Sequence, residues 1–467
     1  MYNVFFMDDF RVASHFTINA GVRYELMPPL HEKYGRMSNL DIAPGFTAVA
    51  PVIPGSIGPY TGRFPDGLVN TDANNFAPRI GLAWRPLKGR HLQIRSGYGW
   101  YYNGPSANQA AFRLSQQPPF AQTATLVTTI TAPLTIQGAF VAATPGKITN
   151  SYAVDRFYRL AYAQTWNFSI QTDLPYSLML DLTYLGTKGT RLDIQRLPNR
   201  AAPGSYLTAE QRRLIGNATG FTFDSSEGNS IFHSGSARLT RRFRRGVSAN
   251  AYYSFGKSID NASTFGGGGV TVAQNDKDLS AERGISSFDL RHTFSLFYMF
   301  STASGRGGGG SVTRQVQNAF WKDWTLTGGV TIRSGSPFTA QVLGNRSDQG
   351  GTGSVGSGRA DATGLPLYTG TGFFNLAAFT IPPPGRFGNA GRNTIRGPVF
   401  FSMNMSFGRT FRFKDNRRSV DLRAEASNVL NSVNITRIGT VVNAVTYGLP
   451  LNAAPMRSVS LNLRMRF

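Results

Sequence analysis

Residues able to carry out catalysis or bind a metal ion are few in this sequence and lie far apart. The chain has no cysteine, which excludes a cysteine nucleophile, disulfide bonds and cysteine–zinc sites. Neither a GxSxG motif nor a P-loop occurs. The five histidines show no HExxH motif and no paired spacing: His15, His31, His91, His233 and His292. We therefore predict no metal ion, no cofactor and no catalytic site, in a protein that is not an enzyme.

Four acidic residues lie close together in the sequence: Asp260, Asp276, Asp278 and Glu282. Carboxylates suit a hard cation such as Ca²⁺, but this spacing matches no calcium-binding loop. We favour salt bridges that fix a loop, with Arg283 and Arg291 as the partners. The other acidic residues are scattered along the chain, so no pair of carboxylates stands out as suited to glycoside hydrolysis.

A more regular pattern is formed by single arginines within segments of alternating apolar and polar residues. Each lies on the polar side of the alternation: Arg23, Arg95, Arg238, Arg291, Arg423 and Arg464. Alternate side chains of a β-strand point to opposite faces, so these arginines share a face with other polar residues. The net charge of +23 comes with no basic helix and no lysine-rich tail, so we do not predict nucleic-acid binding.

The alternating segments are the elements that must carry these arginines. The last of them, SVSLNLRMRF, has one face made entirely of apolar residues: Val459, Leu461, Leu463, Met465 and Phe467. We predict strands at residues 2–12, 15–27, 75–85, 91–102, 160–173, 177–188, 231–243, 247–258, 288–301, 321–334, 400–412, 419–430 and 456–467. Strands of soluble proteins average about five or six residues, whereas a tilted strand needs roughly 9–11 residues to cross a bilayer. The lengths therefore favour a membrane β-structure.

The connections between these strands alternate between short turns and long segments, although the connector 302–320 is long where a short turn is expected. We predict extracellular loops without regular structure at residues 28–74, 103–159, 189–230, 259–287, 335–399 and 431–455. Short turns at one end and long loops at the other are typical of outer-membrane barrels. The predicted fold is all-β, a transmembrane antiparallel up-and-down β-barrel.

In such a barrel the six arginines would be lumen cations. A cationic lumen would favour anionic ligands or an acidic plug domain. Alternatively, the arginines pair with acids on neighbouring strands, such as Asp181 and Asp421. The sequence leaves both roles open.

The number of predicted strands bears on the extent of the barrel. Bacterial single-chain barrels have an even number of strands and both termini on the periplasmic side. The thirteen predicted strands would instead begin on the extracellular side, and MYNVFFMDDF is not a signal peptide. No run of about 18 apolar residues occurs. We expect a C-terminal fragment with an open or incompletely closed sheet, edged by residues 2–12 and 456–467.

Several stretches resemble a known family. "YSFGKSIDNASTFGGGG" with "LSAERGISSFDLRHTFSLFYMF", and "FNLAAFTIPPPGRFGNAGRNTIRGPVFFSMNMSFGRTFRF" with "VDLRAEASNVLNSVNI", are similar to the C-terminal barrel of Oar-like TonB-dependent receptors. The opening "FFMDDFRVASHFTINAGVRYELMPP" is similar to a mid-barrel strand pair of these receptors. The resemblance spans essentially the whole chain and is most specific over residues 250–300 and 385–432. It implies a barrel of about 22 strands, a plug and a carboxypeptidase regulatory-like domain in the intact protein.

The resemblance also implies a function. An outer-membrane transporter of this family takes up a large, scarce ligand, of the siderophore, oligosaccharide or peptide class, with energy from the TonB complex. The terminal aromatic Phe467 would be recognised by the barrel-assembly machinery. Two alternatives remain: a surface or adhesion protein of the same fold that does not transport, and a soluble secreted β-protein that binds glycans.

Overall fold

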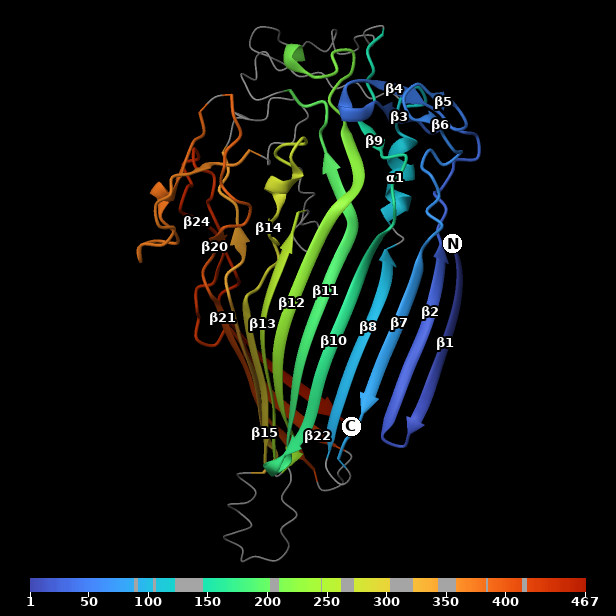
Figure 1. Cartoon of the computed structure of the whole chain (residues 1–467). Coiled ribbons are helices and arrows are strands. Elements are labelled where there is room, and N and C mark those ends of the chain that lie inside the picture. Colours follow the sequence, from blue (N-terminus) through green and yellow to red (C-terminus); the bar gives the residue numbers. More distant parts are fainter. Residues whose placement is uncertain are drawn as a thin grey trace, which may run out of the picture.

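One continuous sheet forms the body of the protein (Figure 1). The computed structural model describes residues 1–87, 91–103, 106–121, 146–201, 210–244, 246–261, 273–302, 322–342, 358–383, 385–413 and 418–467. The main strands pair antiparallel in this order: β1 (Tyr2–Ala13), β2 (Phe16–Leu26), β7 (Phe76–Trp84), β8 (Leu92–Asn103), β10 (Ala161–Leu174), β11 (Leu178–Arg196), β12 (Thr222–Arg244), β13 (Val247–Asp260), β15 (His292–Ser301), β16 (Trp324–Arg333), β21 (Phe400–Arg412), β22 (Ser419–Ser427) and β25 (Ser458–Arg466).

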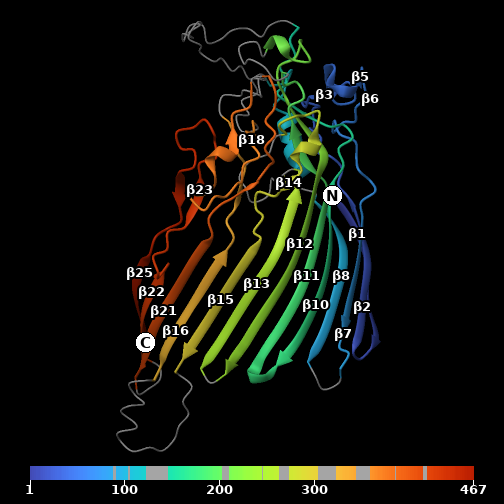
Figure 2. The same cartoon turned by 60° about the vertical axis from the view of Figure 1, so that its left-hand side comes forward.

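All the predicted strands are present, and the all-β, up-and-down antiparallel arrangement is confirmed. The sheet is curled and tilted, and its long connections lie at one end, here called the loop end (Figures 1 and 2). In the sheet order, β1 pairs with β2 alone and β25 with β22 alone, so the predicted open sheet with these two edges is also confirmed. The connector 302–320 lies almost wholly outside the described residues.

The two faces of the sheet follow the predicted alternation because every strand pair keeps register over most of its length. In the outermost pair, Leu463 lies opposite Leu422, and Arg464 lies opposite Asp421. The apolar residues of this single-layer wall have no protein layer above them, and Leu461 is 76% exposed. An apolar face of this extent needs an apolar environment in place of water.

Two strands run further than predicted. Strand β11 continues to Arg196 and β12 begins at Thr222, so the pair extends well beyond the other strands at the loop end. Register shifts between Thr190 and Leu192, and between Leu192 and Ile194, interrupt the alternation here. The extension was missed because a bulge breaks the period of two on which the prediction rests.

The prediction of loops without regular structure is wrong for the described parts of the long segments. They contain α1 (Ser106–Leu114) and several 3₁₀ turns, including η6 (Leu279–Glu282). Their short strands are β3 (Asn39–Ile42), β4 (Val49–Val52), β5 (Ile57–Gly58), β6 (Gly62–Arg63), β9 (Tyr152–Val154), β14 (Gly284–Ile285), β17 (Pro337–Phe338), β18 (Asp361–Ala362), β19 (Phe379–Thr380), β20 (Ile395–Arg396), β23 (Ile435–Ile438) and β24 (Pro450–Ala453). None of the described helices has the length and apolarity required to span a membrane.

The apolar cores of the molecule lie in these segments and not in the wall. One core surrounds Phe64 and Leu68, a second surrounds Phe221, and a third surrounds Phe374 and Ile395. Each segment brings too few apolar residues to bury alone, but neighbouring segments supply the rest. The loop end is therefore a packed assembly built on top of the sheet.

Candidate functional site

The predicted lumen arginines that lie on the polar face are engaged with neighbouring side chains. Arg23 Nε lies 2.8 Å from Glu25 Oε1, two residues along the same face, and Glu25 is buried. Arg95 Nη2 donates to Gln93 Oε1 at 3.0 Å. Arg423 Nη1 lies 3.8 Å from Glu425 Oε1, and both side chains are about half exposed.

The remaining two arginines of this face, Arg238 and Arg464, have acidic cross-strand neighbours. Arg238 stands opposite Asp181 on one side and its guanidinium lies 5.3 Å from the ring centroid of Tyr252 on the other. Arg464 stands opposite Asp421. The ion pairs described on this face join acids of the same strand, Glu25 and Glu425, while Arg238 and Arg464 only stand opposite acids in register. Both predicted roles of these arginines therefore stay predictions.

Arg291 departs from its predicted position. Strand β15 begins at His292 and not at residue 288, so the alternation does not extend to Arg291. Its guanidinium lies 5.7 Å from the ring centroid of Phe255, which alternates with the polar residues of β13 and belongs to the apolar face. The strand starts late because Asp289 is held in the loop end, where its carboxylate accepts from Ser258 N at 2.6 Å.

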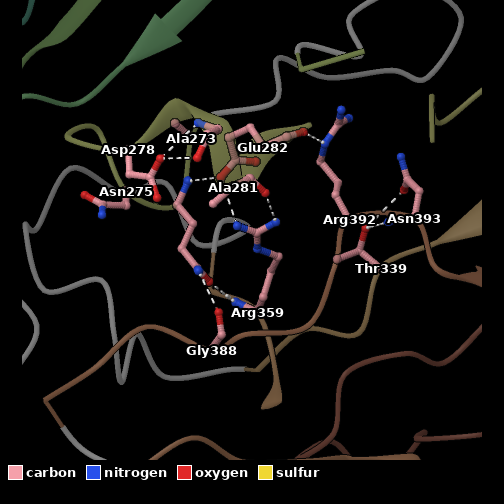
Figure 3. Close-up of polar contacts among 12 residues, drawn as sticks. Ala273, Asn275, Asp278, Ala281, Glu282, Thr339, Arg359, Gly388, Arg392 and Asn393 are labelled. Carbon is pink, nitrogen blue, oxygen red and sulfur yellow. Dashed lines mark hydrogen bonds and ion pairs between the residues drawn. The ribbon is translucent and has the colours of Figure 1, made fainter. Parts of the chain in front are cut away.

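The acidic cluster does form ion pairs, but not with the predicted partners; Figure 3 shows the pair of Glu282 with Arg359. Glu282 Oε1 lies 3.1 Å from Arg359 Nη2, and Asp260 pairs with Arg392. The pairs join residues 77 and 132 positions apart. Arg283 instead donates to Asn229 Oδ1 at 2.8 Å.

The other two acids of the cluster bind backbone groups. Asp278 caps η6 by accepting from Ser280 N at 3.1 Å, and Asp276 Oδ1 accepts from Leu197 N at 2.8 Å. Within the described residues, no group of three or more histidine, aspartate or glutamate side chains is arranged to hold a metal ion.

The two ion pairs form a buried latch between two parts of the chain. The first part carries Asp260, at the end of β13, and Glu282, in η6, and the second segment carries Arg359 and Arg392. The four charged side chains are nearly inaccessible, at 1% exposure for Asp260 and 2% for Glu282. Gln274 strengthens the same contact, because its Nε2 donates to Gly388 O at 2.9 Å and its Oε1 accepts from Arg359 N at 2.8 Å. A third pair, Asp289 with Arg396, ties the second segment to the base of β15.

A second feature of the loop end is an aromatic cavity of about 230 Å³, lined in part by Phe46, Phe64, Phe157, Phe223, Asp155 and Arg156. The Arg156 guanidinium lies 5.1 Å from the ring centroid of Phe64 and 5.3 Å from that of Phe157. Burial raises the pKa of Asp155, whose Oδ1 accepts from Phe157 N at 2.9 Å. Aromatic walls with a few fixed polar groups are typical of small-ligand pockets. The sequence carried no signal for this cavity, since its lining comes from four separate segments.

The extended part of β11 and β12 holds two carboxylates in close proximity. Burial, together with the charge of Asp224, raises the pKa of Asp193 to about 6. Burial also raises the pKa of Asp224, although its Oδ2 accepts from the Tyr152 hydroxyl at 2.5 Å. Both carboxyl groups therefore hold a proton more tightly than an exposed aspartate does.

Comparison with known proteins agrees with the fold. The chain resembles the outer membrane transporter YddB from Escherichia coli at a TM-score of 0.53 and 12% identity, covering 100% of this chain and 45% of YddB. The siderophore receptor PiuA from Acinetobacter baumannii gives a TM-score of 0.46 at 11% identity, with coverage of 99% and 42%. The FrpB iron transporter from Neisseria meningitidis gives 0.46 at 12% identity, with coverage of 99% and 44%. The chain thus spans less than half the length of these solved structures.

A protein-family model matches nearly the whole sequence. No curated protein matches the chain. The model described as "Outer membrane beta barrel domain" matches residues 1–459. Its predicted strands, its alternating faces and its separate loop end are those of such a domain. The chain therefore belongs to the outer membrane beta barrel domain family and is located in the outer membrane.

Proposed function

We propose that the chain forms the barrel wall and the extracellular loop assembly of a TonB-dependent transporter of the Oar-like type. The observation that carries the proposal is the packed loop end, with its latch and aromatic cavity, standing over a sheet whose polar face holds paired arginines. A ligand would bind at the loop end, which we place outside the cell. It would then pass along the polar face, after a plug supplied by the longer protein has moved.

The aromatic cavity is our candidate for the first ligand contact. Phe157 is 56% exposed, so its ring is accessible from the surface, while Arg156 and Asp155 offer one group of each charge. A planar or apolar part of a larger ligand suits such walls. We place the ligand in the siderophore, oligosaccharide or peptide class, and we assign the chain no catalytic role.

The experiment uses the natural gene, with all its flanking coding sequence, in the bacterium from which it comes. Strains lacking the gene, lacking TonB, or carrying Phe157→Ala are grown on defined sources of iron, glycans or peptides. We expect one nutrient whose uptake is lost in the first two strains and reduced in the third. Phe168→Ala is the matched control, because Phe168 is similarly exposed on the apolar face of β10.

Two results would overturn the proposal. If uptake of every nutrient is unchanged in the gene deletion while attachment to surfaces is lost, the protein is an adhesin of the same fold. If the gene deletion removes an uptake that the TonB deletion leaves intact, transport does not depend on TonB.

We also propose that Phe467 is recognised by the barrel-assembly machinery. Its side chain is 94% exposed and follows the last residue of β25, so it is free to be bound. Deleting Phe467 should lower the amount of folded receptor in the outer membrane, measured by heat-modifiable mobility on gels. Deletion of the residue with an unchanged folded amount would contradict this role.

A further inference from the structure

Four cationic side chains gather at one rim of the apolar face, next to the loop end: Lys188, Lys257, Arg283 and Arg291. Lys188 continues the apolar alternation of Leu182 and Tyr184 on β11. Lys257 continues that of Tyr253 and Phe255 on β13. Both lysines therefore project on the side that meets lipid.

The pairing of the strands brings these residues together. Lys257 stands directly opposite His233 on β12, and Lys188 stands directly opposite Ile231, two residues further along the same face. Arg283 donates to Asn229, the next residue of that face, which is a diagonal neighbour of Lys188. Such diagonal neighbours are about 7–8 Å apart, within reach of long side chains.

Arg291 completes the cluster from the other side. Its guanidinium lies over Phe255, which is opposite His292 in the ladder. Two hydroxyl–imidazole pairs stand between the cations: Tyr184 Oη lies 2.8 Å from His233 Nδ1, and Tyr253 Oη lies 2.8 Å from His292 Nδ1. These groups add hydrogen-bonding capacity beside the charges.

Within the part of the chain that the structure describes, none of the four cations forms an ion pair. The nearest acids along the chain are already bound: Glu282 to Arg359 and Asp289 to Arg396. Four adjacent positive charges repel one another, so a bound anion would stabilise the rim.

The height of the cluster identifies the kind of anion. Lys188 and Lys257 each lie ten residues from the turn-end start of their strands, at Leu178 and Val247. Ten residues tilted by about 40° rise about 25 Å, which equals the height of the apolar band of a barrel. Apolar side chains such as Leu182 and Leu239 fill the same face below the cluster. A molecule held here meets charge at its head and an apolar wall beneath.

We propose that this rim is a binding site for the phosphate headgroup of a lipid in the membrane leaflet at the loop end. In the orientation proposed above, that leaflet is the outer one. The site takes a phosphate-bearing lipid and not a free phosphate ion, because the cluster adjoins a face that acyl chains cover. The inference depends on the outer-membrane location and not on transport. A negative result in the uptake experiment would therefore leave it unaffected.

The test measures lipid binding to the natural full-length receptor, purified in a neutral detergent. Phosphatidic acid is the probe and phosphatidylcholine is the reference, and bound lipid is counted by native mass spectrometry. We expect the variant K188Q/K257Q/R283Q to bind phosphatidic acid at least about tenfold more weakly than wild type, since each cation near a headgroup contributes to the attraction. Lys33→Gln is the matched control, because Lys33 is an exposed cation of the loop end that lies over Tyr34 and is not part of the four-residue cluster.

Further variants and a competing ion distinguish the possible outcomes of this experiment. The conservative variant K188R/K257R should bind as wild type does, and the single variant K257Q should bind several-fold more weakly even if the triple variant fails to fold. Equal binding of phosphatidic acid by wild type and K257Q would overturn the proposal. It would also fail if phosphatidylcholine binds as tightly as phosphatidic acid, or if millimolar inorganic phosphate displaces the lipid completely, which would make this a site for the free ion.

Discussion

The strand wall and the loop end hold their apolar residues in opposite ways. In the wall, large apolar side chains stay uncovered by protein, as with Phe6 at 71% and Leu461 at 76% exposure. At the loop end, Phe64 is 2% exposed within a core assembled from separate segments. The wall thus depends on lipid and on the hydrogen bonds of its ladder, whereas the loop end is stabilised like a small soluble domain.

The ion pairs of the two regions also differ in how deeply they are buried. The ion pairs of the wall, such as Arg423 with Glu425, are exposed and therefore worth little. Those of the latch are buried and shared with backbone groups, so losing one partner leaves an uncompensated charge. The same residue types therefore carry different energetic weight in the two regions, and the following variants test this difference.

The largest effect is expected for Arg392→Ala in the latch. Removing the guanidinium breaks the buried ion pair of Arg392 with Asp260, which costs about 3–5 kcal/mol. Hydrogen exchange should show faster opening of the segments around Glu282 and Arg359, while the wall strands β7, β8 and β10 keep their protection. Equal loss of protection in the wall would show that the two regions are not separate units of stability.

The next effect concerns the two faces of the wall. Leu461→Arg places a cation on the apolar face of β25 and should destabilise the membrane-inserted receptor by roughly 2–4 kcal/mol if it lies near the bilayer midplane. Asn462→Arg adds the same charge one residue later, on the polar face, and should be tolerated. The measurement is the denaturant midpoint of the refolded receptor in lipid. Similar losses in both variants would argue against the assigned faces.

A smaller effect is expected from pH at the loop end. The raised pKa of Asp193, about 6, means that the folded state binds this proton more tightly than the unfolded state. The protonated Asp193 carboxyl group contributes its full stabilisation of the folded state below the ordinary pKa of an aspartate. This stabilisation is lost as pH rises through about 6. Asp193→Asn should therefore stabilise the β11–β12 extension at pH 7 by about 1–2 kcal/mol and flatten its dependence on pH. Hydrogen exchange between pH 5 and 7.5 provides the measurement, with Asp278→Asn as an exposed control.

The smallest effect is expected for Arg423→Ala. Its ion pair with Glu425 spans 3.8 Å between half-exposed side chains, so its loss should change stability by less than about 1 kcal/mol. The denaturant midpoint in lipid should be within error of wild type. A loss as large as that of Arg392→Ala would mean that wall and latch charges are equivalent after all.

The wall could be predicted closely and the loop end could not. Strands such as β13 and β21 were located within a residue or two, because a period of two is a local property of the sequence. The prediction for Arg291 was wrong because it extended that period past the point where β15 begins, at His292. The acids of the latch were rightly expected to form salt bridges, yet their partners Arg359 and Arg392 are distant in sequence, and no spacing rule could select them.

By itself, the sequence determined the all-β class, the main strands, the composition of each face and the end at which the long segments lie, because alternation and segment length act locally. Only the tertiary structure decided which loop segments share a core, which arginine meets which acid, and where Phe46, Phe64, Phe157 and Phe223 enclose a cavity. It alone also placed Lys188, Lys257, Arg283 and Arg291 on one rim. These contacts depend on strand register and chain return over long distances, which short-range patterns do not encode.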